Sequence, residues 1–291
     1  MSSERVSVLL VGLDGLGGYY LNGDEADARQ RMPTLFGLLD QSTVGTITGR
    51  TVFPPISAPA WVSALSGMTP DMTGVIHKLW DPEVCVGCPN ARAGTPVPLN
   101  VFDALDSATT HKSIVASWSW LLKLVNGDVC QCALDAGGDD DKAVRLFAES
   151  CSYDKGVLPH CFSFVHLDLI DAAGHKHKWE SEEYKQSWSA ADRRLQELIA
   201  TAQQHATSTQ RDLVVLVVSD HGGSGNDHGD IIPSHMQIPL IVWQSETNAS
   251  KRPVHVDVVQ SEISILDITP TILAVLGEKI PRWVRGTALL Q

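Results

Sequence analysis

Aspartate and histidine side chains follow three apolar stretches of strand length in this 291-residue sequence. The six that stand out are Asp14, Asp171, His175, Asp220, His221 and His228. Carboxylate and imidazole groups together suit zinc, manganese or iron, whereas a calcium site is mostly oxygen. If these groups meet in space, they predict a centre for divalent cations.

Gathering six such groups without a counter-charge is costly, because buried carboxylates close to one another raise each other's pKa. Divalent cations remove that conflict. Mixed Asp and His ligation favours zinc, with manganese and iron as alternatives. Six ligands exceed the four of one tetrahedral ion, so the sequence predicts two metal ions about 4 Å apart, as in other two-metal hydrolytic sites.

Each of these residues also has an ordinary structural interpretation. Asp14 taken alone is better explained as a turn former or helix cap, and Asp171 with His175 fits a hydrogen-bonded turn. Asp220 and His221 end an apolar run and precede two glycines, which has no packing explanation, so we interpret them as ligands. Four further side chains compete for these roles: His166, Asp168, His177 and His235. The remaining histidines are expected to be structural or on the surface: His77, His111, His160, His205 and His255.

A hydroxyl nucleophile is also visible. The segment 53–61 runs from a proline turn into an apolar helix, which places Ser57 at or near the N-cap and Pro59 in the first turn. A helix N-terminus favours negative charge, and a neighbouring cation activates a hydroxyl. We expect Ser57 to attack the substrate, although on this segment alone a simple helix cap is nearly as good an interpretation.

The elements that must position these groups alternate along the chain. Strands are expected over 6–13, 113–116, 162–167, 213–218 and 239–243, and helices over 34–39, 60–65, 101–105, 143–149, 182–205 and 271–276. Continuous runs of Val, Leu and Ile are typical of strands buried on both faces of a parallel sheet. The expected fold class is α/β, a three-layer α/β/α sandwich with a mostly parallel central sheet and its site beyond the carboxyl ends of the strands.

One catalytic domain over residues 1–291 is expected, with a loop or small insertion at about 68–98, where Pro, Gly, Asn and two cysteines break the alternation. The loops 68–98 and 118–138 are expected to select the substrate. Trp118 and Trp120 fit packing better than stacking on a substrate ring. Cys85 and Cys88 form a single C-x-x-C without a second pair at zinc-finger spacing, so they are interpreted as ordinary reduced thiols.

Charge and composition exclude several classes of protein. The chain has 22 Lys and Arg and 34 Asp and Glu, which gives a net charge of -12. This acidic balance argues against a broad surface that binds nucleic acid. A hydrophobic content of 43% supports a large core. The apolar run at 6–13 is too short for a membrane span and lacks a cleavage site, so we expect a cytoplasmic location and no membrane partner.

The order of six motifs resembles the alkaline phosphatase superfamily, most closely its type I phosphodiesterase and nucleotide pyrophosphatase branch. They are Leu13-Asp14-Gly15, Phe53-Pro54-x-x-Ser57, Ser66-Gly67-x-x-Pro70, Asp171-x-x-Gly174-His175, Asp220-His221-Gly222 and His228-Gly229. The resemblance implies an alkaline phosphatase-like fold. It also implies one zinc ion on Asp171, His175 and His228. A second would lie on Asp14, Asp220, His221 and the Ser57 oxygen, where the branch usually has a threonine nucleophile.

The chain departs from that branch in the phosphate pocket. His77 or Lys78 stands where the branch has an asparagine that contacts the phosphate, so both are expected to bind substrate, and Lys78 would favour a more highly charged one. Ser57-x-Pro59 is similar to the sulfatase signature, but Trp61 replaces the arginine that follows.

The resemblance implies a metal-dependent hydrolase of phosphoric esters, acting on a phosphodiester or nucleotide pyrophosphate through a serine nucleophile. The partner expected is a small phosphorylated molecule, such as a nucleotide, and not a nucleic-acid polymer. Alternatives on the same site are a phosphomonoesterase or a phosphonate hydrolase, with a sulfatase less favoured. A non-catalytic protein that binds a phosphate ligand is the alternative from a different class.

Overall fold

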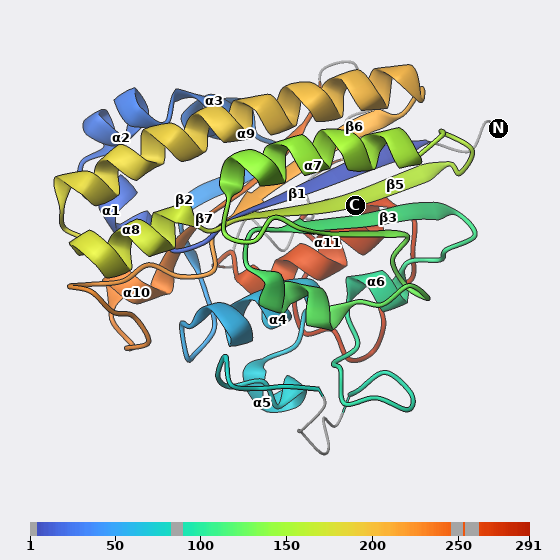
Figure 1. Ribbon diagram of the computed structural model, residues 1–291, viewed down its shortest axis with the longest axis horizontal. Helices are drawn as coiled ribbons and strands as arrows, with labels where there is room; N and C mark the ends of the chain where they lie inside the picture. Colours follow the sequence, from blue (N-terminus) through green and yellow to red (C-terminus); the bar gives the residue numbers. More distant parts are fainter. Residues whose placement is uncertain (1–4, 83–89, 246–252, 254–261) are drawn as a thin grey trace.

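Seven strands form one twisted sheet with helices on both faces (Figure 1). The computed structural model describes residues 5–82, 90–245, 253 and 262–291. The strands are β1 (Val6–Leu13), β2 (Val44–Arg50), β3 (Thr110–Ala116), β4 (Cys132–Asp135), β5 (His160–Leu167), β6 (Asp212–Val218) and β7 (Gln237–Gln244). Their order is β2-β7-β6-β1-β5-β3-β4. This architecture confirms the expected α/β sandwich.

The sheet is mostly parallel. β1 pairs in parallel with β5 and β6, and β3 with β4 and β5. β7 is antiparallel to both of its neighbours, β6 and β2. All eight residues of β1 are buried, as expected of a strand covered on both faces. All five expected strands are present, whereas β2 and β4 were not predicted from the sequence.

Two hydrophobic cores lie on opposite faces of the sheet, because successive side chains of a strand point to opposite sides. Leu9 and Val11 of β1 belong to one core, and Val8 and Leu10 to the other. The first core is covered by α2 (Glu25–Arg31), α3 (Pro33–Gln41), α7 (Asp140–Tyr153) and α9 (Glu182–Ser208). The second is covered by α4 (Ser57–Ser66), α6 (Val101–Ala104), η1 (Ser119–Leu124), η3 (Ile265–Asp267) and α11 (Ile268–Val275).

The six expected helices are present with ends shifted by a few residues. Four short helices complete the described part of the chain: α1 (Gly18–Gly23), α5 (Pro70–Thr73), α8 (Leu169–His177) and α10 (Pro233–Met236). Asp171 and His175 were expected to form either ligands or a simple turn, and they lie on the helix α8 instead of a turn. Among the described helices, none has both the length and the apolar character needed to cross a membrane.

Within the described residues of the segment 68–98, which was expected to form a loop, Pro70–Thr73 form α5, and Ala91 and Pro98 form an isolated bridge. Cys85 and Cys88 lie outside the described residues.

Candidate active site

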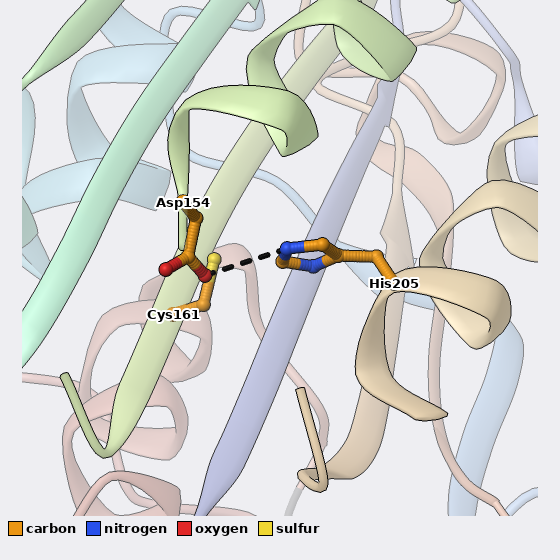
Figure 2. Close-up of side chains that lie close together, drawn as sticks. All are labelled: Asp154, Cys161 and His205. Atoms are coloured by element: carbon orange, nitrogen blue, oxygen red, sulfur yellow. Dashed lines mark ion pairs between the residues drawn. The ribbon is translucent and has the colours of Figure 1, made fainter. Parts of the chain in front are cut away.

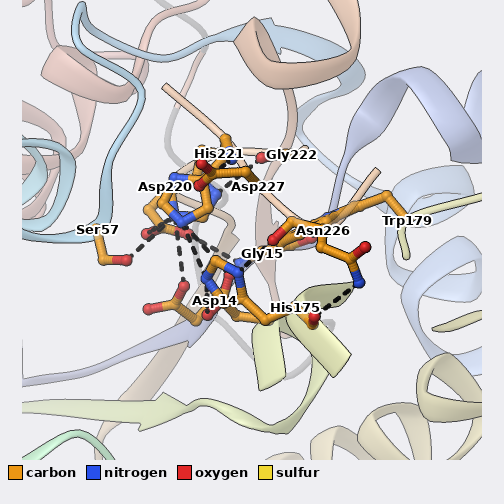
Figure 3. A network of polar contacts seen from close by, with 12 residues as sticks. Asp14, Gly15, Ser57, His175, Trp179, Asp220, His221, Gly222, Asn226 and Asp227 are labelled. Atoms are coloured by element: carbon orange, nitrogen blue, oxygen red, sulfur yellow. Dashed lines mark hydrogen bonds and ion pairs between the residues drawn. The ribbon is translucent and has the colours of Figure 1, made fainter. Parts of the chain in front are cut away.

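Polar side chains gather where β1, β5 and β6 end, and Figure 3 shows part of this cluster. Since β1 pairs in parallel with both neighbours, the carboxyl ends of the three strands lie side by side. The strand ends and the segments that follow them contribute Asp14, Asp171, His175, Asp220, His221 and His228. The structure therefore brings all six predicted ligands to one edge of the sheet.

The first group comprises Asp14, Asp220 and His221, whose ligand atoms lie within 4.8 Å of one another. His221 Nε2 is 3.2 Å from Asp220 Oδ2 and 3.7 Å from Asp14 Oδ1. All three side chains are buried. Ser57 Oγ lies 3.1 Å from the same His221 Nε2, which places the hydroxyl beside this group.

The second group comprises Asp171, His175 and His228. His175 Nε2 is 3.2 Å from His228 Nε2 and 3.4 Å from Asp171 Oδ2, and His228 Nε2 is 3.9 Å from Asp171 Oδ1. The rings of His221 and His228 stack with centroids 3.8 Å apart, so the two groups adjoin.

Backbone carbonyls fix the tautomer of all three imidazoles. Each Nδ1 faces a carbonyl oxygen, which can only accept, so Nδ1 carries the hydrogen and Nε2 keeps a lone pair. The acceptors are Asn226 O for His175 (2.8 Å), Gly222 O for His221 (2.9 Å) and Pro55 O for His228 (3.1 Å). Three lone pairs thus face the carboxylates, which is how histidines that ligate metals are oriented.

The carboxylates each leave one oxygen without a partner. Asp14 Oδ1, Asp171 Oδ1 and Asp220 Oδ2 are buried and accept no hydrogen bond. A buried carboxylate oxygen without a partner costs free energy, and a cation bound there would remove that cost. The free oxygens and the Nε2 lone pairs together fit two divalent cations.

Asp14 is oriented by its other oxygen. Asp14 Oδ2 accepts hydrogen bonds from Trp61 Nε1 (2.8 Å) and His166 Nε2 (2.9 Å). These two donors hold the carboxylate so that Oδ1 faces His221. His166 was one of the residues that competed for a ligand role. Its ligand atom lies close to those of Asp14 and Asp168, but its Nε2 is already used in the hydrogen bond to Asp14. In the sequence, Trp61 only marks the position where the sulfatase signature has an arginine, so its contact with Asp14 was not predicted.

Burial and charge shift the pKa values strongly. Burial and the charge of Asp14 raise the pKa of Asp171 and of Asp220 well above the ordinary value. Burial alone would raise the pKa of Asp14 as well, but the hydrogen bond and charge of His166 bring it to about 2. Burial lowers the pKa of His221 to about 3. Nearby cations would favour the ionised carboxylates and the neutral imidazole.

Trp179 connects the three segments that carry the predicted ligands. Its Nε1 donates to Gly15 O at 3.0 Å, and its ring meets His175 edge-on at 5.2 Å (Figure 3). A Cβ added to Gly174 or to Gly223 would lie 2.5 Å from the indole ring. Both glycines are therefore required by this buried tryptophan, a role that the sequence did not reveal.

Ser57 does not cap the helix on which it lies. Helix α4 begins at Ser57 itself, its N-cap is Ile56, and no side chain makes a cap hydrogen bond. The interpretation of Ser57 as a simple helix cap is wrong. The hydroxyl points instead toward His221 (Figure 3).

A family model described as type I phosphodiesterase / nucleotide pyrophosphatase matches residues 8–98 and 104–254. The chain belongs to this family.

The murine ectonucleotide pyrophosphatase / phosphodiesterase 5 has the same fold, with a TM-score of 0.69 at 13% identity over 99% of this chain and 100% of that chain. A Vibrio parahaemolyticus protein of the alkaline phosphatase superfamily matches 99% of this chain and 70% of its own, with a TM-score of 0.66 and 14% identity. The fungal GPI ethanolamine phosphate transferase 1 of Emericella nidulans is 30% identical over 125 residues, 40% of this chain and 13% of that protein. The matched segment is therefore a small part of that relative. The family match confirms the resemblance to the type I phosphodiesterase and nucleotide pyrophosphatase branch, and the solved structures confirm the alkaline phosphatase-like fold.

In this type I phosphodiesterase family member, a cavity of about 380 Å³ opens over the second group. Ser57, His77 and Lys78 line it together with Trp118. The positive charge of Lys78 acts on Asp171. The predicted nucleophile and both predicted substrate-binding residues therefore face the same space as the second group.

The other competing residues have different surroundings. Asp168 lines the cavity, and burial with the charge of Asp14 raises its pKa to about 6. His235 Nε2 lies 2.8 Å from Ser224 Oγ, and its Nδ1 accepts from Asp230 N. His177 ends α8 on the exposed side and lines no part of the cavity.

Proposed function

We propose that this family member is a metal-dependent hydrolase of phosphoric esters, acting on a phosphodiester or a nucleotide pyrophosphate with Ser57 as the nucleophile. The observation that carries the proposal is the position of Ser57 Oγ, 3.1 Å from His221 Nε2, in the wall of a cavity shared with Asp171, His175 and His228. This position, without a cap hydrogen bond to the helix, supports a role for the hydroxyl as the nucleophile.

We assign one divalent ion to Asp171, His175 and His228, and another to Asp14, Asp220 and His221 with the Ser57 oxygen. Zinc suits this mixture of carboxylates and imidazoles best, with manganese and iron as alternatives. Bound cations would lower the pKa of the hydroxyl and stabilise negative charge on the phosphoryl group.

Side chains of the protein carry out the other parts of the proposed reaction. Ser57 Oγ loses its proton and forms the bond to phosphorus as the bond to the leaving oxygen breaks. A phosphodiester then releases an alcohol, whose oxygen takes up a proton, and a nucleotide pyrophosphate releases a phosphate. Water then cleaves the phosphoserine, which releases phosphate or a phosphomonoester and restores the hydroxyl. Lys78 and His77 bind the phosphoryl oxygens from the open side of the cavity, where a positive charge offsets that of the substrate.

A small nucleotide is the substrate class to examine first, because the structure of an inactive variant of the murine neighbour was solved in complex with AMP. A cytoplasmic location stays a prediction from the sequence.

The test compares bis(4-nitrophenyl) phosphate with 4-nitrophenyl phosphate, in the presence of zinc or manganese and after chelation. We expect turnover that depends on metal and is faster with the diester. Faster turnover of the monoester would favour a phosphomonoesterase. Metal binding without turnover of either ester would contradict the proposal and support the non-catalytic alternative.

A further inference from the structure

A second set of metal-binding side chain types lies at the opposite end of the sheet. Asp154 follows α7, Cys161 lies near the start of β5, and His205 is in the last turn of α9 (Figure 2). Their ligand atoms lie within 4.8 Å of one another. Asp168 follows Cys161 by seven positions along β5 and its end, so this cluster is about 23 Å from the candidate active site.

The His205 ring points toward the Asp154 carboxylate and the Cys161 thiol (Figure 2). His205 Nε2 is 3.5 Å from Asp154 Oδ2, is buried and makes no hydrogen bond. His205 Nε2 is therefore available as a ligand atom.

A small cavity of about 10 Å³ adjoins these side chains, which is about the space of one water molecule or one ion. Cys151, Cys161 and His205 line it, and so does Ser7, which is 5% exposed. The Ser7 Oγ atom is buried without a hydrogen-bond partner. Two unpartnered polar atoms thus belong to residues that line one small cavity, which two cysteines also line.

The charges around this cluster would stay balanced with one divalent ion bound. Arg211 pairs with Asp154 through its Nη1, and its Nη2 lies 3.3 Å from Asp154 Oδ1, so the carboxylate charge is already neutralised. Binding of the ion would release the protons of the Cys161 and Cys151 thiols. Two thiolates would cancel the charge of one divalent ion, which leaves the buried group neutral.

We propose that Cys161, His205 and Asp154, with Cys151 as the fourth ligand, form an additional binding site for one zinc-type divalent ion at the amino end of β5. Thiolate and imidazole ligands favour such an ion, and four ligands from three elements match a closed structural site. Tetrahedral zinc bonds of about 2.0–2.3 Å require the side chains to close by about 1 Å. The site ties α7, β5 and α9 together and is independent of the proposed hydrolysis.

Cobalt(II) tests the assignment, because thiolate ligation gives an intense near-ultraviolet charge-transfer band that carboxylate and imidazole ligands do not give. The candidate active site contains no cysteine, so the band does not depend on it. The titration uses the full chain with Cys85→Ser and Cys88→Ser, which removes the two thiols outside the described residues. We expect the band to saturate by three cobalt ions per chain, since the two cation groups of the candidate active site also take up cobalt, and to disappear when zinc is added.

In that background, Cys161→Ser and His205→Gln should each reduce the band at least about tenfold at equal cobalt, as expected when a ligand is lost. Cys130→Ser, which removes another buried thiol, should leave the band unchanged and controls for general disturbance. His205→Gln keeps the test valid if Cys161→Ser fails to fold. Absence of the band in the parent chain, or a full band in folded Cys161→Ser or His205→Gln, would overturn the proposal.

Discussion

At the scale of single residues, the two oxygens of Asp14 have different environments. Oδ2 accepts hydrogen bonds from Trp61 and His166, whereas Oδ1 is buried without a partner. Asp220 repeats this pattern, with Oδ1 bonded to Gly15 N and Oδ2 unpartnered. One oxygen of each carboxylate is thus held by the protein, and the other is free for a cation.

Ser57→Ala should lower kcat for the diester at least about 10³-fold, because the attacking oxygen is removed. Ser57→Thr should retain turnover, since it keeps a hydroxyl at the same position. Ser63→Ala, on the same helix and fully buried, is the matched control and should leave the rate unchanged. Turnover by Ser57→Ala above a tenth of the parent rate, with metal content measured alongside, would reject Ser57 as the nucleophile.

Asp220→Asn should make the metal-free protein more stable at pH 7.5 by about 1 kcal/mol, because a buried unsatisfied oxygen is replaced by an amide that can donate to His221. Burial raises the pKa of Asp220, so above pH 3.8 the folded chain retains a proton that the unfolded chain loses. The free energy of unfolding of the metal-free parent therefore falls as the pH rises from 3.8 toward the raised pKa of Asp220 in the folded chain.

Urea unfolding in chelator at pH 5 and pH 7.5 measures this effect. The parent should lose more stability between the two values than Asp220→Asn does. If Asp220→Asn is less stable than the parent when both are free of metal, the interpretation of Asp220 as a ligand with an unsatisfied buried oxygen is wrong.

Trp61→Phe should weaken metal binding about 10- to 100-fold, the usual effect of losing a donor behind a ligand. Trp188→Phe removes a similar buried ring from α9, far from the carboxylates, and should leave metal affinity unchanged. Calorimetric titration with zinc measures both. Equal losses in the two variants would mean that packing, and not the hydrogen bond to Asp14, is responsible.

At the scale of elements, Trp179 determines how closely α8 approaches the end of β6. Gly174→Ala should destabilise the fold by about 1–3 kcal/mol and lower occupancy of the Asp171 group, because the new methyl would meet the indole at 2.5 Å. Gly37→Ala in α3 has open space around it and should stabilise by up to about 1 kcal/mol. Thermal unfolding and metal content measured on both variants test this, and a neutral Gly174→Ala would contradict it.

The ease of prediction differed among elements for physical reasons. β1 and β6 are continuous apolar runs, which only a strand buried on both faces requires. β2 contains two glycines and alternating polar residues at the edge of the sheet, so its pattern is weak. The predicted ligands could be found because they follow the ends of apolar strands, which are visible in the sequence and meet at one edge of the sheet. Trp61 and Trp179 could not, since their contacts cross 47 and 164 residues of chain.

At the scale of the whole molecule, the candidate ligands sit at one edge while the two cores fill the faces of the sheet. Each ion that binds only the folded chain stabilises it by about 2.7 kcal/mol when free metal is 100 times the dissociation constant. Chelation should therefore lower the melting temperature, and hydrogen exchange should accelerate mainly at 14–16, 168–179 and 219–230. Uniform acceleration through β1 and β6 would contradict a local centre.

The order of strands has a consequence for how this chain is made. β1 is synthesised first, but its neighbour β6 and the residues up to His228 emerge from the ribosome some 200 residues later. Until then the most buried strand lacks one edge, and no truncated product ending before that point could assemble either cation group. Nascent chains should therefore depend on chaperones until His228 has emerged, and loading with metal should follow only after that point.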